Sequence, residues 1–179
     1  MRGVWAGAMA MGLAALVLTA GRAAAAVFPI DEEAVRAALN GRQGALVVID
    51  TATGEESRFN PELASKKFAP CSTFKIWNTL IGLETGVLQS ADQGFYQWDG
   101  VKRFVPDWNK DLTLREAFRV SCVPAFQALA RKIGAERMKE WVDRIEYGDR
   151  NVSSGLDVFW LPGQGRTPLL ITAEEQARL

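Results

Sequence analysis

The first third of the chain alternates between helical and strand-like hydrophobic patterns. Apolar residues recur at helical spacing over 32–39, and Asn40 then supplies a helix stop. A β-branched apolar run follows at 45–50, and a polar strand-like segment follows at 56–60. Because the turn residues Thr53-Gly54 separate them, the two segments predict a hairpin that begins an antiparallel sheet.

The clearest helical pattern runs from residue 72 to residue 84, with Ser72 as N-cap or first-turn residue and Gly86 as the stop. This segment is too apolar for an ordinary surface helix, so we expect it to be buried. Its apolar positions are Phe74, Ile76, Leu80, Ile81 and Leu83.

Helices are predicted to dominate the rest of the chain. Residues 89–110 show no clear period and are expected to be a loop. Helices are expected over 113–120, from Pro124 to Gly134, and over 136–146. A capping box at Thr172 and Glu175 then predicts one more helix start. With a single hairpin and several helices, the expected fold class is α+β: a helical region packed on an antiparallel sheet whose C-terminal strands are missing.

The N-terminus has the pattern of a secretory signal peptide. Arg2 is followed by an uncharged run over 4–21 and by the small residues Ala24-Ala25-Ala26. Removal of residues 1–26 would leave 27–179 as one partial domain in the periplasm or outside the cell, with no stable membrane anchor. The alternative is an uncleaved anchor, because the run barely reaches spanning length.

Composition narrows the chemistry. The chain is 48% hydrophobic and carries 21 basic and 21 acidic residues, which fits a globular domain and gives no basic patch for nucleic acid. A small-molecule substrate is therefore expected, and the sequence gives no sign of oligomeric state. The absence of histidine excludes a Ser-His-Asp triad, a Cys-His dyad and a His-ligated zinc site. A hydrolase of this composition needs a lysine or a carboxylate as its base.

Ser72 and Lys75 are the candidates for nucleophile and base. Three residues apart on a helix, they share one face, so their side-chain ends can meet. The helix N-terminus favours negative charge on the serine oxygen, and apolar burial would depress the lysine pKa until the amine can accept a proton. The alternative is a solvated lysine on a polar helix face.

These residues resemble a known family. Pro70 to Ile76, continued by Ile81 to Gly86, is similar to the active-site helix of class D (oxacillinase-type) serine β-lactamases. Further motifs follow in the family's order, and four ordered motifs together are specific where each alone is weak. They are Asp111-Leu112-Thr113-Leu114, Ser121-Cys122-Val123, Tyr147-Gly148-Asp149 and Phe159-Trp160-Leu161.

The resemblance implies a mechanism without metal or organic cofactor. Ser72 would open the β-lactam ring of a penicillin-type substrate and form an acyl-enzyme that water hydrolyses. Lys75 would be N-carboxylated by carbon dioxide or bicarbonate and act as general base, with the indole N–H of Trp160 as hydrogen-bond donor. Ser121 would pass a proton to the leaving nitrogen. The structural alternatives are a helix cap for Ser121 and a core position for Trp160.

Four further positions support the site by the same resemblance. Val123 and Leu161 would form an apolar wall that controls the access of water to the carbamate, or they are ordinary core residues. Tyr147 and Gly148 are expected to form a structural turn near the site.

The chain departs from the family pattern in three places. Asp149 stands where asparagine is usual, which puts the local hydrogen bonds in doubt, and Trp77 is bulkier than the usual proline. No Lys-Thr-Gly or Lys-Ser-Gly follows Leu161. In the family that motif binds the substrate carboxylate on a strand that also supplies an oxyanion-hole N–H. We therefore expect the 179-residue form to be inactive or unfolded.

The two cysteines, Cys71 and Cys122, each lie beside a candidate serine. A disulfide and a pair of reduced, buried thiols both remain open from the sequence. Three other functions also remain open: a penicillin-binding transpeptidase or carboxypeptidase, the β-lactam-binding domain of a membrane sensor, and an inactive fragment.

Overall fold

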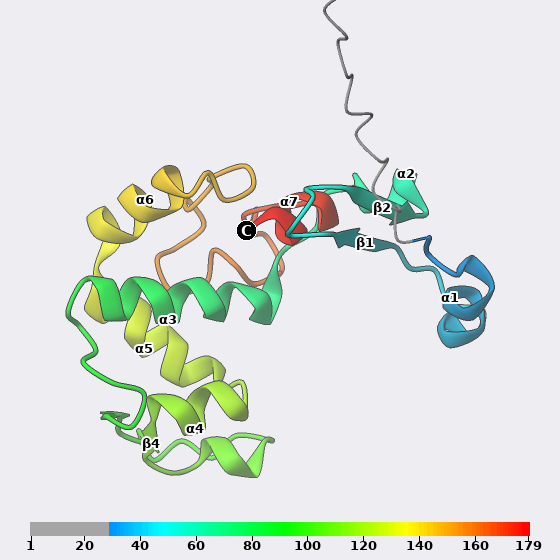
Figure 1. Ribbon diagram of the computed structural model, residues 1–179. Helices are drawn as coiled ribbons and strands as arrows, with labels where there is room; N and C mark the ends of the chain where they lie inside the picture. Colours follow the sequence, from blue (N-terminus) through cyan, green and yellow to red (C-terminus); the bar gives the residue numbers. More distant parts are fainter. Residues whose placement is uncertain (1–28) are drawn as a thin grey trace, which may run out of the picture.

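The computed structural model describes residues 29–179, so the predicted signal peptide at residues 1–26 lies outside the described part. Figure 1 shows the fold arranged around helix α3 (Phe74–Glu84), with α5 (Val123–Ile133) crossing it and α6 (Ala135–Arg144) on the other side. A short 3₁₀ turn over Cys71–Thr73 leads directly into α3. These elements position the candidate site.

The predicted N-terminal helix and hairpin are both present. Helix α1 (Glu32–Leu39) begins after Asp31, whose side chain accepts from the backbone N–H of Ala34, and it ends at the left-handed Asn40. Strands β1 (Leu46–Ile49) and β2 (Glu56–Phe59) pair antiparallel. The four-residue helix α2 (Pro61–Ala64) follows at once, because Pro61 ends the strand but fits the first turn of a helix.

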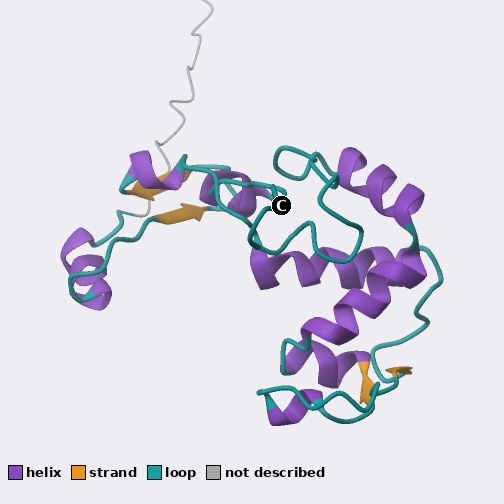
Figure 2. Cartoon of the chain, turned by 180° about the vertical axis from the view of Figure 1, so that it is seen from behind, coloured by secondary structure: helices purple, strands orange, loops and turns teal. Residues whose placement is uncertain are grey.

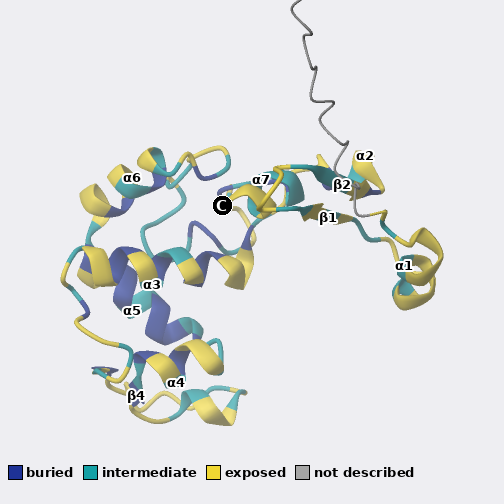
Figure 3. Ribbon diagram, viewed as in Figure 1, coloured by how far each residue is buried: buried dark blue, intermediate teal, exposed yellow. Residues whose placement is uncertain are grey.

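The core lies between α3, α5 and α6. Figure 3 shows the inward faces of these helices as buried, and α3 and α5 are in direct contact. Large apolar side chains fill this space at full or nearly full burial, as expected for close-packed helices. They include Phe74, Ile81, Phe126, Leu129, Ile133, Met138 and Val142.

The expectation that the α3 segment is buried is wrong for one of its faces. Ile76 is 50% exposed, Leu80 44% and Leu83 37%. The helix packs against α5 through the opposite face, which carries Phe74 and Ile81. The apolar pattern of the sequence could not show that only one face of the helix is covered.

The stretch 89–110 is not wholly a loop. It contains strand β3 (Gly94–Tyr96), which pairs with β4 (Leu112–Thr113), and a 3₁₀ turn over Pro106–Trp108. A strand of three residues is too short to show a period of two, which explains why the pattern missed it. The two strand pairs lie apart, on either side of the helices (Figure 2), and no larger sheet is formed within residues 29–179.

The remaining helices begin where the sequence predicted. Thr113 and Glu116 form a capping box for α4 (Leu114–Arg119), and Thr172 and Glu175 form one for α7 (Ala173–Arg178). Helix α7 contacts β1, which ties the C-terminal residues to the hairpin. The α+β class is confirmed. None of the helices in the described residues has the length and apolar character needed to cross a membrane.

Candidate active site

Lys75 lies in the first turn of α3, and its side chain is buried against the chain segment that carries Ser121. The residue is only 2% exposed. Its Nζ lies 3.1 Å from Ser72 Oγ, 2.7 Å from Ser121 Oγ and 2.7 Å from the Ser121 carbonyl oxygen. The three candidate catalytic residues therefore meet at one nitrogen atom, although Ser121 is far from the other two in sequence.

Left-handed backbone conformations position both serines next to Lys75. Ser72 sits in the 3₁₀ turn before α3, immediately after Cys71 with φ 51°, and Ser121 itself has φ 51° between α4 and α5. Left-handed backbone is uncommon for residues other than glycine and costs about 1–3 kcal/mol where the surroundings impose it. Because Ser121 turns back in this way, its carbonyl and its hydroxyl both face Lys75.

The surroundings of Lys75 are apolar. The Phe126 ring of α5 lies 5.7 Å from Nζ, and the fully buried Phe74 precedes Lys75 on α3. Burial away from water lowers the pKa of Lys75 to about 8, while the nearby Cys122 and Cys71 thiols act weakly in the opposite direction. A substantial fraction of the amine is therefore neutral near physiological pH, as a general base requires.

Trp160 lies against the same turn. It is fully buried, it stacks on Phe74 with ring centroids 5.6 Å apart, and its carbonyl accepts from the backbone N–H of Cys71 at 3.0 Å. Its indole N–H has no hydrogen-bond partner among the described residues. A buried donor without a partner is rare in native proteins, so this N–H could bind an acceptor that residues 29–179 do not provide.

Val123 and Leu161 are the last residues of the two motifs that contain Ser121 and Trp160, and both are half-buried. Val123 is the first residue of α5, and Leu161 continues the segment of Trp160. Both residues therefore lie at the boundary between core and solvent.

Tyr147 and Gly148 form a turn beside α3. The Tyr147 ring packs edge-on against Phe74 at 5.2 Å, and its hydroxyl accepts from Gln176 Nε2 at 2.8 Å. Burial raises the pKa of the Tyr147 hydroxyl. Gly148 has φ 54°, and a Cβ there would lie 2.3 Å from the Leu170 carbonyl oxygen, so only glycine fits.

Comparisons with known proteins identify the family. A family model described as the penicillin binding protein transpeptidase domain matches residues 37–179. The chain belongs to the penicillin-binding protein transpeptidase domain family.

Among curated proteins, this transpeptidase domain is similar to class D β-lactamases. It is 52% identical to β-lactamase OXA-10 of Pseudomonas aeruginosa over 58% of this chain and 38% of that protein. It is 39% identical to β-lactamase OXA-48 of Klebsiella pneumoniae over 75% of this chain and 49% of that protein. The chain thus spans half or less of the length of these relatives.

Solved structures similar to this chain are also class D β-lactamases. The class D β-lactamase FUS-1 (OXA-85) of Fusobacterium nucleatum subsp. polymorphum matches with a TM-score of 0.74 and 40% identity, covering 82% of this chain and 60% of that one. A class D β-lactamase of Bacillus subtilis matches with a TM-score of 0.73 and 37% identity, covering 79% and 58%. The predicted resemblance to class D enzymes is confirmed.

Two departures from the class D pattern are accommodated in the transpeptidase domain. Asp149 Oδ1 accepts from the backbone N–H groups of Leu170 and Asn151, each at 3.1 Å. An asparagine oxygen could accept both bonds, so the position uses an acceptor and tolerates the carboxylate. Trp77 is half-buried and packs edge-on against Tyr147 at 6.3 Å, without interrupting α3.

The cysteines of the transpeptidase domain are both free thiols. Cys122 is fully buried, as expected for a reduced cysteine, and burial raises its pKa. The expectation of burial is wrong for Cys71, which is exposed as the first residue of a 3₁₀ turn that buries none of its residues. No group of three or more His, Cys, Asp or Glu that could hold a metal occurs in residues 29–179.

Two contributors to the site were missed from the sequence. Phe126 faces the Lys75 amine, and Gln176 joins Tyr147 to Thr73 Oγ1, to which it donates at 2.8 Å. Phe126 lies within the helix predicted from Pro124 to Gly134, but nothing in its local pattern links it to Lys75. Gln176 lies 103 residues from Thr73 in the chain, and no local pattern links positions so far apart.

The lowered pKa of Lys75 makes stability depend on pH in one direction. Below pH 8 both the folded and the unfolded chain carry the charge, so its burial is fully unfavourable. Between pH 8 and 10.5 the folded state releases the proton first, so the free energy of unfolding rises, by up to about 3 kcal/mol. Urea unfolding between pH 7 and 11 measures this rise.

Lys75→Met should remove the rise, whereas Lys139→Met, at a half-exposed position of α6, should retain it. Parallel pH profiles for the wild type and Lys75→Met would contradict the burial of a titrating amine.

Proposed function

We propose that this chain carries the acylation centre of a class D-type serine β-lactamase, EC 3.5.2.6. The observation that carries the proposal is the buried Lys75 amine, 3.1 Å from Ser72 Oγ, with a pKa lowered to about 8. The similarity to named β-lactamases supports the same activity. The substrate is a penicillin-type β-lactam.

The geometry supports a simple proton path. A neutral amine has two N–H groups and one lone pair, and Nζ has three partners. The Ser121 carbonyl can only accept, so it takes one N–H, which leaves the lone pair for a hydroxyl proton. Ser72 Oγ then attacks the lactam carbonyl carbon as its proton passes to Lys75. The C–N bond of the ring breaks, and the Ser121 hydroxyl relays a proton to the leaving nitrogen.

We further propose that Lys75 becomes N-carboxylated. The unprotonated amine attacks carbon dioxide, an N–C bond forms, and the nitrogen loses one proton to water. The product is an anion in an apolar site, and such an anion needs hydrogen-bond donors. The unpartnered indole N–H of Trp160 fits that need. Once formed, the carbamate would replace the free amine as general base in both acylation and hydrolysis, while Val123 and Leu161 would limit the access of water to the site.

A penicillin-binding transpeptidase or carboxypeptidase remains the second candidate, because the matching family model is that of a transpeptidase domain. Acylation through Ser72 is common to both activities. Rapid release of the acyl group by water distinguishes a β-lactamase, and the carboxylated lysine is the group that would activate that water.

The sequence of residues 1–26 supports export to the periplasm or the cell exterior.

Acylation tests the nucleophile. Incubation of the chain with a penicillin should add one intact penicillin mass to Ser72, detected by mass spectrometry of the protein and its peptides.

Ser72→Ala should give no adduct, and Lys75→Met should slow its formation by at least about 10²-fold through loss of the base. Ser65→Ala, at an exposed serine, is the matched control and should react like the wild type. An adduct on a residue other than Ser72, or none after a day with the folded protein, would refute the assignment.

Carboxylation of Lys75 is tested by ¹³C NMR in ¹³C-bicarbonate. One carbamate resonance should appear, grow as pH rises from 6 to 8.5 with the fraction of neutral amine, and vanish in Lys75→Met. Trp160→Phe should weaken it by removing the indole donor, whereas Trp98→Phe should not. An unchanged resonance in Lys75→Met would place the carbamate elsewhere, and no resonance in the wild type would exclude it.

A further inference from the structure

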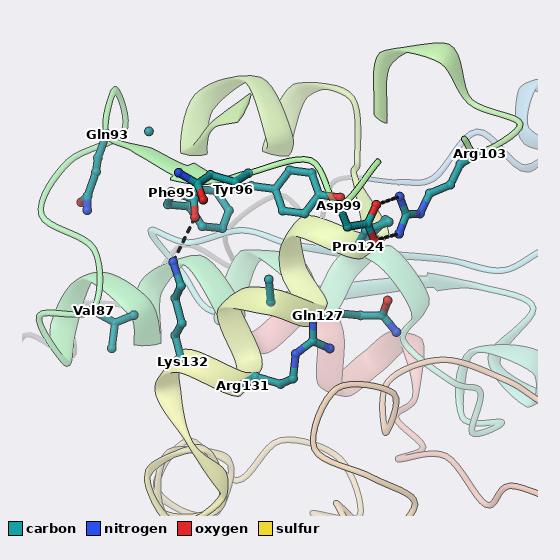
Figure 4. A pocket seen from close by; sticks show the side chains of 13 residues that line it. Val87, Gln93, Phe95, Tyr96, Asp99, Arg103, Pro124, Gln127, Arg131 and Lys132 are labelled. Carbon is teal, nitrogen blue, oxygen red and sulfur yellow. Dashed lines mark hydrogen bonds and ion pairs between the residues drawn. The ribbon is translucent and has the colours of Figure 1, made fainter. Parts of the chain in front are cut away.

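A cavity lies away from the Ser72 site, between α5 and the segment 93–103. It has a volume of about 530 Å³, within the range of small-molecule sites. Figure 4 shows side chains from both elements turned toward it, among them Tyr96, Arg103, Arg131 and Lys132. Neither Ser72, Lys75, Ser121 nor Trp160 lines it, so the cavity has no part in the proposed acylation.

Within the described part of the chain, one positive charge of the cavity has no carboxylate partner. Arg103 holds Asp99 through two nitrogens, at 2.8 and 2.6 Å, and Arg131 is paired with Asp157. Lys132 Nζ donates to the Phe95 carbonyl at 3.0 Å and forms no ion pair within residues 29–179 (Figure 4). Because an ammonium has three N–H groups, Lys132 can also bind an anion in the cavity.

Tyr96 supplies a second group that lacks a partner. The residue is 6% exposed, and its hydroxyl makes no hydrogen bond among the described residues. Burial raises the pKa of this hydroxyl, so it stays protonated and remains a donor. In Figure 4 the ring extends along the cavity toward Asp99. A buried hydroxyl in a cavity wall is a place where a polar group of a ligand can bind.

The rest of the lining decides the class of ligand. Val87, Phe95, Pro124 and Ala128 contribute apolar surface to a lining that also carries Gln93, Gln97 and Gln127. Both guanidinium groups that line the cavity are already paired, Arg103 with Asp99 and Arg131 with Asp157, so neither is a free fork of the kind that favours phosphate. We propose that this cavity binds a small aromatic monocarboxylate, with its carboxylate at Lys132 and a second polar group at the Tyr96 hydroxyl.

Calorimetric titration of the full chain with 4-hydroxybenzoate tests the charge. Saturable binding to one site is expected, and the neutral 4-hydroxybenzamide should bind at least about tenfold more weakly, because one charge-assisted hydrogen bond is lost. Lys132→Gln should weaken 4-hydroxybenzoate by a similar factor while its amide can still donate to Phe95. Lys139→Gln, on the exposed side of α6, should leave it unchanged. Equal binding of acid and amide, or of wild type and Lys132→Gln, would overturn the proposal.

Tyr96→Phe tests the hydroxyl separately. It removes a buried group that has no partner, so the variant should fold normally, which circular dichroism can verify. Its affinity for 4-hydroxybenzoate should fall to that for benzoate, and its affinity for benzoate should stay at the wild-type value. Failure of 4-hydroxybenzoate to bind the folded wild type, or inorganic phosphate binding more tightly than it does, would contradict a monocarboxylate site.

Discussion

Burial of a single amine is the constraint on which the rest of the site depends. An ammonium group taken out of water is destabilising by several kcal/mol unless it is paired or loses its proton. Lys75 has no carboxylate partner among the described residues and is surrounded instead by hydroxyl, carbonyl and aromatic groups. The fold therefore favours the neutral form of the Lys75 amine. Burial of this lysine costs stability, but the neutral amine that results can act as the base for Ser72.

Several elements must be in place for that burial. Helix α5 contributes Phe126, and the turn before it bends into left-handed backbone at Ser121, so that two oxygens reach the amine. Trp160 stacks on Phe74, and its carbonyl accepts a hydrogen bond from the backbone N–H of Cys71, the residue before Ser72. Strained backbone of this kind persists only where surrounding packing holds it, and here the packing comes from the fully buried core between α3 and α5.

The sequence correctly predicted the features that depend on residues close together in the chain. The capping boxes at Thr113 and Thr172 marked two helix starts, and the spacing of Ser72 and Lys75 predicted their contact. It could not show that Ile76 faces outward, because that depends on which face of α3 another element covers. The bridge from Gln176 to Thr73 and the cavity around Lys132 also depend on segments that are distant in sequence and meet only in the fold.

The state of the Lys75 amine is most directly observed by NMR. Lysine labelled with ¹³C at Cε, assigned by comparison with Lys75→Met, reports the protonation of each amine as pH is varied. One lysine is expected to titrate with a midpoint near pH 8, well below the ordinary 10.5. A Lys75 signal that titrates at 10.5 with the solvent-exposed lysines would show a charged, hydrated side chain and contradict the account.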